Sequence, residues 1–292
     1  MQSPAMESAR AIESEAVLLI DNGSLKPGST LGLRVIAERL GHALGCAVTP
    51  VSLSHADAVP AASLGGRPAE VLEAALECRA REGVDRFLII PLFFGPCAAL
   101  TDRVPACVER VRARFPQMQV RMARCLVAAG DKTDDRVAAM IEAHVRAKMA
   151  GAAPRPAIIL VDHGSPERAV TLVRDHLAAR LAVRLGASIS GVRAASMERR
   201  PGAAYDFNDP SLDRALDESD ARAGLVIVAM QFLLPGRHAG PNGDIVRICA
   251  AARRRHPGLR VALTDLVGSH PELIELLADR AREGRAAAPL AV

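Results

Sequence analysis

The chain has 292 residues, which is enough for two domains of ordinary size, each able to bury its own core. Half of the residues are apolar and 24% are charged, a composition typical of a folded protein rather than a disordered one. The net charge of +4 is spread over interspersed charges of both signs, and the chain has six Phe, one Tyr and no Trp, so we expect no nucleic-acid-binding surface.

The N-terminal segment and the cysteines indicate a cytoplasmic protein. Residues 1–16 lack the basic start and the apolar run of a signal peptide, and no apolar stretch approaches the roughly 20 residues of a membrane span. The six cysteines form no CxxC pair and have no metal-ligand spacing. We therefore expect free thiols, most of them buried, and no membrane association.

Both halves of the chain alternate short β-branched apolar runs with longer amphipathic segments. In the first half we expect strands near 16–21, 47–53, 86–92 and 118–123, with helices between and after them. The segment Gly151–Pro156 is rich in Gly, Ala and Pro and indicates a linker. In the second half we expect strands at 157–162, 187–193, 224–230 and 259–264, and helices at 168–184, 209–222, 243–255 and 271–283.

The fold class follows from this alternation. Continuous apolar runs such as Leu225–Ala229 suit strands that are covered on both faces. The βαβα order predicts a parallel sheet flanked by helices. We predict an α/β protein of two tandem, doubly wound parallel-sheet domains, 1–150 and 151–292, facing each other across a cleft.

The two halves are copies of one unit. Ala16–Ser24 reads AVLLIDNGS, and Ala157–Ser165 reads AIILVDHGS 141 residues later. Arg114–Pro116 and Arg255–Pro257 repeat at the same spacing, and a Leu-Val pair repeats at 140 residues. Three matches in the same order at nearly one spacing indicate a tandem duplication.

Polar side chains follow each predicted strand of the second copy. His163, Glu198, His238 and His270 follow the first, second, third and fourth strands. The carboxyl ends of parallel strands form the ligand crevice of an open sheet. We therefore expect three imidazoles and a carboxylate to approach one cleft.

The first copy lacks these imidazoles. Asn22 stands where the second copy has His163, and His238 falls near Ala99. A structural role shared by both copies predicts similar side chains in both, so the asymmetry favours a functional site in the second copy, with the first as a wall or lid. A lone histidine at a strand end is more often a hydrogen-bonded structural residue than a ligand. For His270 the alternative is that it only starts a helix, because Pro271 follows it and proline is favoured at the first position of a helix. We take the remaining histidines as surface residues: His42, His55, His144, His176 and His256.

The expected ligands favour a metal that is bound weakly and released. Neutral imidazole suits Co, Ni, Fe and Zn, whereas Mg and Ca prefer oxygen clusters. The site has no thiolate, which makes a structural zinc site a poor fit. Glu198 stands beside arginines and is a candidate proton acceptor.

These motifs resemble those of the class II tetrapyrrole chelatases, the CbiX-like sirohydrochlorin cobaltochelatase and ferrochelatase group. The matching stretches are Asp162–Ser165, Glu198–Pro201 with Asn208–Leu212, Phe232–Ile245 and Gly268–Leu273. The resemblance covers nearly the whole chain as two family units. Only Asn22–Ser24 and Pro91–Phe94 keep the pattern in the first unit, which is therefore expected to be degenerate.

The resemblance implies a reaction and roles. The enzyme would be a lyase that inserts Co²⁺ or Fe²⁺, with Ni²⁺ also possible, into sirohydrochlorin in cobalamin or siroheme biosynthesis, without an organic cofactor. His163 and His238 would bind the metal, and Glu198 would help to remove the pyrrole protons. Ser165, Arg199 and Arg237 would contact the polycarboxylate macrocycle, and Arg193 and Arg200 would lie at the same rim.

Two other functions stay open. A non-catalytic tetrapyrrole or metal carrier would bind its ligand tightly without turnover. A nucleotide-binding α/β protein ranks last, because no GxGxxG or GxxxxGK[ST] motif follows a strand. The residues do not separate Co²⁺ from Fe²⁺ or Ni²⁺. Since the tandem pair can supply internally what single-unit relatives obtain by dimerising, we expect a monomer.

Overall fold

A computed structural model describes residues 15–127, 134–149, 155–218 and 224–291. The chain forms two compact units, one of residues 1–126 with 274–292 and one of residues 127–273. Most of the expected linker, 151–156, lies outside the described residues.

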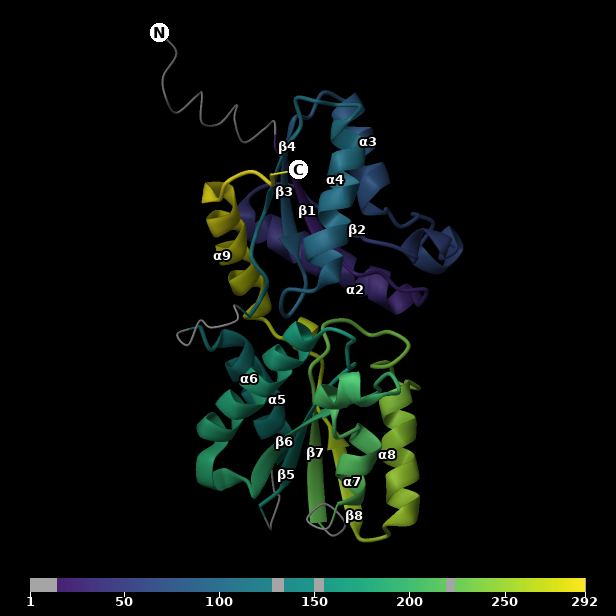
Figure 1. The fold of residues 1–292 in the computed structure, drawn as a ribbon, viewed down its shortest axis with the longest axis vertical. Coiled ribbons are helices and arrows are strands. Elements are labelled where there is room, and N and C mark those ends of the chain that lie inside the picture. The colour runs from purple at the N-terminus through teal and green to yellow at the C-terminus, as the bar shows by residue number, and fades with distance from the viewer. Residues whose placement is uncertain (1–14, 128–133, 150–154, 219–223, 292) are drawn as a thin grey trace. The chain divides into compact units, whose positions relative to one another are not determined.

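The N-terminal unit is a four-stranded parallel sheet in the order β2-β1-β3-β4. Its elements are β1 (Glu15–Asp21), α2 (Pro27–Leu44), β2 (Val48–Ser52), α3 (Leu72–Arg81), β3 (Arg86–Pro91), α4 (Val104–Arg112), β4 (Gln119–Met122) and α9 (Leu273–Ala286). Alternate buried residues of the strands, such as Leu18 and Ile89, pack with α3 and α4 on one face (Figure 1). Strands buried on both faces need continuous apolar runs, which this half of the sequence has.

The C-terminal unit repeats the design with the order β6-β5-β7-β8, again all parallel. Its elements are α5 (Arg136–Met149), β5 (Ala157–Asp162), α6 (Arg168–Leu185), β6 (Gly191–Ser196), α7 (Leu212–Asp217), β7 (Gly224–Met230), α8 (Asp244–Arg255) and β8 (Leu259–Leu263). Helices α5 and α6 lie on one side of this sheet, and α7 and α8 on the other (Figure 1). The α/β class and the doubly wound parallel sheets predicted from the sequence are confirmed.

One strand boundary was wrong. The second strand of this sheet was expected at 187–193, but β6 runs from Gly191 to Ser196. A short 3₁₀ turn over Gly186–Ser188 takes up the preceding residues, since a glycine there ends α6. The shift matters because it places the end of β6 two residues before Glu198.

The compact units do not follow the boundary expected at residue 150. Helix α5 ends the first sequence copy but belongs to the C-terminal unit, and almost all of α9 belongs to the N-terminal unit. Arg280 of α9 is fully buried and donates hydrogen bonds to the carbonyls of Cys125 and Leu126. These bonds attach α9 to the end of the N-terminal sheet.

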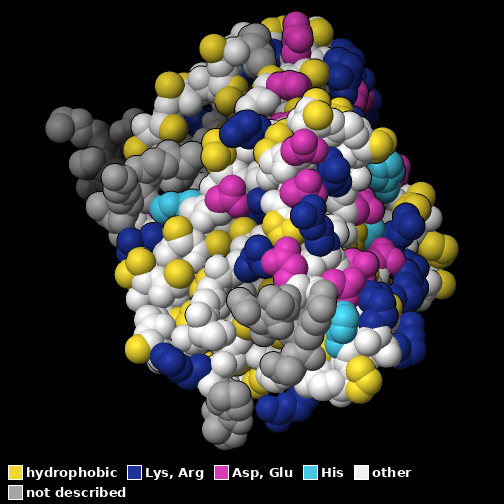
Figure 2. Space-filling view, turned by 60° about the horizontal axis from the view of Figure 1, so that its bottom comes forward, with side chains coloured by type: hydrophobic (Ala, Val, Ile, Leu, Met, Phe, Trp, Pro, Cys, Tyr) yellow, Lys and Arg dark blue, Asp and Glu magenta, His cyan; other side chains and the backbone are white. Residues whose placement is uncertain are grey.

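The interspersed charges and the free cysteines agree with the sequence, but the burial of the thiols does not. On the face drawn in Figure 2, cationic and anionic side chains are interspersed. All six cysteines are free, but only Cys107 and Cys249 are buried, three others are half-buried and Cys78 is exposed, so the expectation that most thiols are buried was wrong. In the described part of the chain, no helix is both long and apolar enough to cross a membrane.

Candidate metal centre

The loop after β5 holds His163 close to the loop after β6. Gly164 has a φ of +88°, and a Cβ at this position would lie 1.9 Å from the carbonyl oxygen of Glu198. The amide of Met197 donates to the carbonyl of Asp162 at 2.8 Å, and the amide of Glu198 donates to that of His163 at 3.1 Å. Only a glycine permits this close approach, which places Glu198 beside His163.

A buried polar cluster lies beneath this loop. Arg174 is 2% exposed, donates to the Ser196 hydroxyl at 2.5 Å and lies 3.9 Å from the carboxylate of Asp162. Burial raises the pKa of Asp162, and the Ser196 hydrogen bond and Arg174 oppose that rise. The Asn208 side chain accepts from the amide of Ser165 at 3.0 Å and donates to its carbonyl at 2.8 Å. The cluster therefore fixes the loop that carries His163.

The rings of His163 and His238 meet through their Nε2 atoms, which are 3.2 Å apart. The ring centroids are 4.5 Å apart, and the planes are inclined by 71°. Nδ1 of His163 lies 2.9 Å from the carbonyl of Gly164, and Nδ1 of His238 lies 2.6 Å from Asp244. A carbonyl and a carboxylate only accept hydrogen bonds, so we assign the protons to Nδ1. In the neutral rings both Nε2 atoms then present lone pairs to the same point.

Asp244 orients His238. It is the first residue of α8, where a carboxylate is favoured by the helix dipole. Hydrogen bonds from Arg247 and His238 lower the pKa of Asp244, so it stays ionised. A carboxylate on the second nitrogen of a metal-binding histidine fixes the tautomer and strengthens the ligand. Asp244 lies within the Phe232–Ile245 motif, but its sequence context alone does not indicate this role.

The pair of rings has the spacing of two ligands on one metal ion. Metal–imidazole bonds of about 2.1 Å place two nitrogens on one ion about 3.0–3.4 Å apart. Oε1 of Glu198 lies 3.4 Å from Nε2 of His163, and the Glu198 side chain is 61% exposed. Within the described ranges, no group of three or more His, Cys, Asp or Glu side chains is arranged to hold a metal. The site thus offers two placed imidazoles and one nearby, exposed carboxylate.

The predicted macrocycle contacts have other partners in their own loops. The Ser165 hydroxyl accepts from the amide of Glu167 at 3.0 Å. Arg199 pairs with Asp206 at 2.8 Å and with Asp209 at 3.2 Å. Arg237, in contrast, is 75% exposed and lies 3.8 Å from Asp244. Of the three, Arg237 has the side chain most available to a ligand.

Two expectations about outlying residues were wrong. Arg193 lies inside β6, pairs with Glu218, and is not at the carboxyl edge of the sheet. His144 is not a surface residue: its Nε2 is buried and has no hydrogen-bond partner among the described residues. Its ring lies 5.3 Å from that of His270, and burial, followed by His270, lowers the pKa of His144. His270 therefore contacts His144 and is not part of the His163–His238 pair.

A family model described as CbiX matches residues 16–147 and 157–284, one match for each sequence copy. No curated protein has significant sequence similarity to the chain.

Three solved structures share the fold. SirB from Bacillus subtilis with Fe³⁺ has a TM-score of 0.69 at 17% identity, covering 93% of this chain and 96% of SirB. SirB from B. subtilis subspecies spizizenii, described as a sirohydrochlorin chelatase in complex with cobalt, has a TM-score of 0.68 at 15% identity, covering 95% and 99%. CbiX, described as the terminal enzyme for siroheme biosynthesis in denitrifying bacteria, has a TM-score of 0.56 at 16% identity, covering 92% and 98%.

Proposed function

The chain belongs to the CbiX family, and from that premise we propose that it inserts a divalent metal, Co²⁺ or Fe²⁺, into sirohydrochlorin. The observation that carries this proposal is the 3.2 Å approach of two imidazole Nε2 atoms at the carboxyl edge of the C-terminal sheet. Relatives of the same fold are described with cobalt and Fe³⁺, and one as a sirohydrochlorin chelatase. The degenerate N-terminal copy has an asparagine in place of His163.

The first step in the proposal is capture of the metal, which is a substrate. His163 and His238 bind it through Nε2, because their Nδ1 protons are held by Gly164 and Asp244. Two imidazoles give fewer ligands than the four of a structural zinc site, so the ion keeps open positions. The metal ion needs such open coordination positions to bind the four pyrrole nitrogens of the macrocycle.

The second step is removal of protons from the macrocycle. A divalent ion that enters the ring displaces two pyrrole protons, and an acceptor must stand near the metal. Glu198 lies beside the metal-facing nitrogen of His163, and its exposure allows each proton to pass to water. Arg237 is the proposed contact for an acidic side chain of the substrate, and Ser165 a second polar contact. Arg199 supports the Glu198 loop through Asp206 and Asp209.

Metal insertion by the purified full chain tests the proposal. Absorbance changes of sirohydrochlorin are followed with Co²⁺, Fe²⁺ and Ni²⁺ in turn, with protoporphyrin as the control substrate. His163→Ala and His238→Ala are compared with His42→Ala, an exposed histidine of α2. We expect the first two to fall to the uncatalysed rate and His42→Ala to match wild type.

Two results contradict the proposal. If His163→Ala and His238→Ala retain wild-type rates, these imidazoles do not deliver the metal. If wild type binds sirohydrochlorin and metal tightly but never exceeds the uncatalysed rate, the chain is a carrier.

The cellular setting is part of the same proposal. Six free cysteines favour a reducing compartment, and we propose the cytoplasm. We also propose a monomer, because the tandem copies provide two units in one chain. Light scattering of the purified protein measures the mass against 30.8 kDa for one chain.

A further inference from the structure

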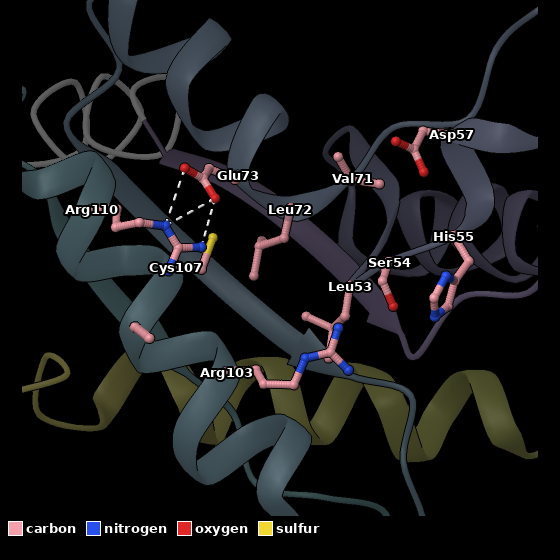
Figure 3. A pocket seen from close by; sticks show the side chains of 11 residues that line it. Leu53, Ser54, His55, Asp57, Val71, Leu72, Glu73, Arg103, Cys107 and Arg110 are labelled. Carbon is pink, nitrogen blue, oxygen red and sulfur yellow. Dashed lines mark hydrogen bonds and ion pairs between the residues drawn. The ribbon is translucent and has the colours of Figure 1, made fainter.

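The N-terminal unit has a hollow of about 470 Å³ beside its own carboxyl sheet edge (Figure 3). This volume lies in the range of small-molecule sites. Its lining includes Leu53, Ser54, His55, Leu72, Arg103 and Arg110. In Figure 3, Arg103, Ser54 and His55 lie toward one end of the hollow, and Glu73 with Arg110 toward the other.

Arg103 occupies the position that Asp244 has in the C-terminal unit. The buried residues of α8 recur in α4 one repeat length, 141 residues, earlier: Ile245, Cys249 and Ala252 correspond to Val104, Val108 and Val111. The residue before Ile245 is Asp244, and the residue before Val104 is Arg103. An anionic side chain in one unit is thus replaced by a cationic one in the other.

The other two positions of the site also carry different side chains in the N-terminal unit. Gly23 meets the carbonyl of Ser54 as Gly164 meets that of Glu198, so Ser54 stands where the C-terminal unit has Glu198. Asn22 stands in place of His163. The Ser54 hydroxyl donates to the carbonyl of Asn22 at 3.4 Å, and Arg103 contacts the Asn22 amide oxygen at 3.5 Å. Asn22 therefore brings the serine and the arginine together, as His163 and its neighbours meet in the other unit.

Of the four charged side chains that line the hollow, Arg103 and Asp57 have no ion pair among the described residues, and Arg103 is the cation of the two. Arg110 donates three hydrogen bonds to Glu73, the shortest of 2.6 Å, and the two charges offset each other. Arg103 has no carboxylate within ion-pair distance among the residues that the structure describes. Within that part of the chain, its exposed guanidinium forms a hydrogen bond only with the Asn22 amide oxygen, through one nitrogen, which leaves further donors for an anion.

His55 supports a ligand-binding role for this edge. It is the one residue other than glycine with a positive φ, +67°, in the described ranges. A side chain is disfavoured in that conformation, and such strain is concentrated at functional positions. The strained backbone holds the imidazole at the wall of the hollow, next to Ser54.

We propose that this hollow binds the carboxylate of a short aliphatic acid arm, with Arg103 as the ionic partner and Ser54 and His55 as polar contacts. One unpaired cation near Asp57 suits a carboxylate group, which carries a single negative charge, better than a phosphate group, which can carry two on the same group. The wall formed by Leu53, Val71 and Leu72 suits the carbon chain that bears the acid. The identification of this arm as an acidic side chain of the tetrapyrrole rests on the proposed function.

The test uses full-length, ¹⁵N-labelled protein and titrates it with glutarate, with the dimethyl ester of glutarate and with inorganic phosphate. Amide shifts of Ser54 and His55 and the side-chain signal of Arg103 report binding. Arg103→Ala is compared with Arg39→Ala, which removes an exposed arginine of α2 outside the hollow. We expect glutarate to bind wild type and Arg39→Ala alike, at least tenfold weaker binding by Arg103→Ala, and no shift with the ester.

Each other outcome overturns the inference. Equal glutarate binding by wild type and Arg103→Ala, or no binding to wild type, removes the site. Stronger shifts with phosphate than with glutarate show a phosphate site instead of a carboxylate site. Binding of Co²⁺ alone is measured in parallel, and Arg103→Ala should leave it unchanged. Loss of glutarate binding therefore says nothing against the metal site, and loss of Co²⁺ binding says nothing against the hollow.

Discussion

The two sheets of this protein end in the same backbone geometry. Asp21 and Asp162 end the first strand of each unit and are both buried. Gly23 and Gly164 follow them with φ values of +87° and +88°, and a Cβ on either would lie within 2 Å of a carbonyl oxygen of the neighbouring loop. The N-terminal unit thus has the same loop conformation as the C-terminal unit, although it lacks the imidazoles.

The two edges differ in the side chains that this geometry carries. The C-terminal edge presents His163 and Glu198, groups that bind cations and accept protons. The N-terminal edge presents Asn22 and Arg103. The loop conformation is therefore a property of the scaffold, and the chemistry depends on a few side chains that point out of it.

The largest effect should come from removing a proposed metal ligand. His163→Ala deletes one of two imidazoles, so we expect Co²⁺ affinity to fall by more than about 100-fold, beyond the loss typical of outer-shell changes. Asn22→Ala alters the corresponding position of the other unit and should leave Co²⁺ affinity as in wild type. Isothermal titration of the two variants measures both. Equal losses would show that the two edges are not chemically distinct.

The glycines test the shared geometry. Because a Cβ at Gly164 or Gly23 would overlap a backbone oxygen, alanine at either position should lower the free energy of unfolding by about 2–4 kcal/mol. Only Gly164→Ala should also weaken Co²⁺ binding. Gly45→Ala is the control: it has a φ of +66° and open space around it, so it should cost about 1 kcal/mol. Urea unfolding that ranks Gly45→Ala with the other two would contradict the close-approach argument.

The sequence predicted the sheets well, because their apolar runs are continuous. The predicted span 224–230 is that of β7, and the histidines at 163 and 238 do converge. The exchange of α5 and α9 between the units could not be predicted. An amphipathic pattern shows that one face of a helix is buried, but not which sheet buries it. Arg174 reads as a surface residue of a helix, and its burial depends on partners distant in sequence, among them Ser196.

A smaller effect should come from the carboxylate behind His238. Asp244→Asn keeps the shape but removes the charge that orients Nδ1, so we expect Co²⁺ affinity to fall about 10- to 100-fold. Asp213→Asn removes an exposed carboxylate of α7 that pairs with Arg255, and it should change the affinity less than twofold. If both variants bind Co²⁺ like wild type, Asp244 does not support the ligand.

The smallest effect concerns the buried aspartates. Arg174 is the seventh residue of α6, whereas the seventh residue of α2 is Leu33, so no buried arginine among the described residues lies beneath Asp21. Burial raises the pKa of Asp21 from its ordinary value of 3.8 to about 6, although the Ser52 hydroxyl opposes the rise. Between these two values the folded chain binds more protons at this group than the unfolded chain. The stabilising contribution is therefore complete below pH 4 and is lost as the pH rises through 6.

Asp21→Asn should remove this dependence on pH. From pH 5 to pH 7 the wild-type free energy of unfolding should lose about 1 kcal/mol more than that of the variant. Urea unfolding followed by circular dichroism at the two pH values measures the difference, in which the titration of the other groups cancels. Parallel pH profiles for the two proteins would mean that Asp21 is ionised in the folded chain. The N-terminal edge would then stabilise a buried negative charge without an arginine, through hydrogen bonds from the Ser52 and Ser29 hydroxyls and the Gly23 amide.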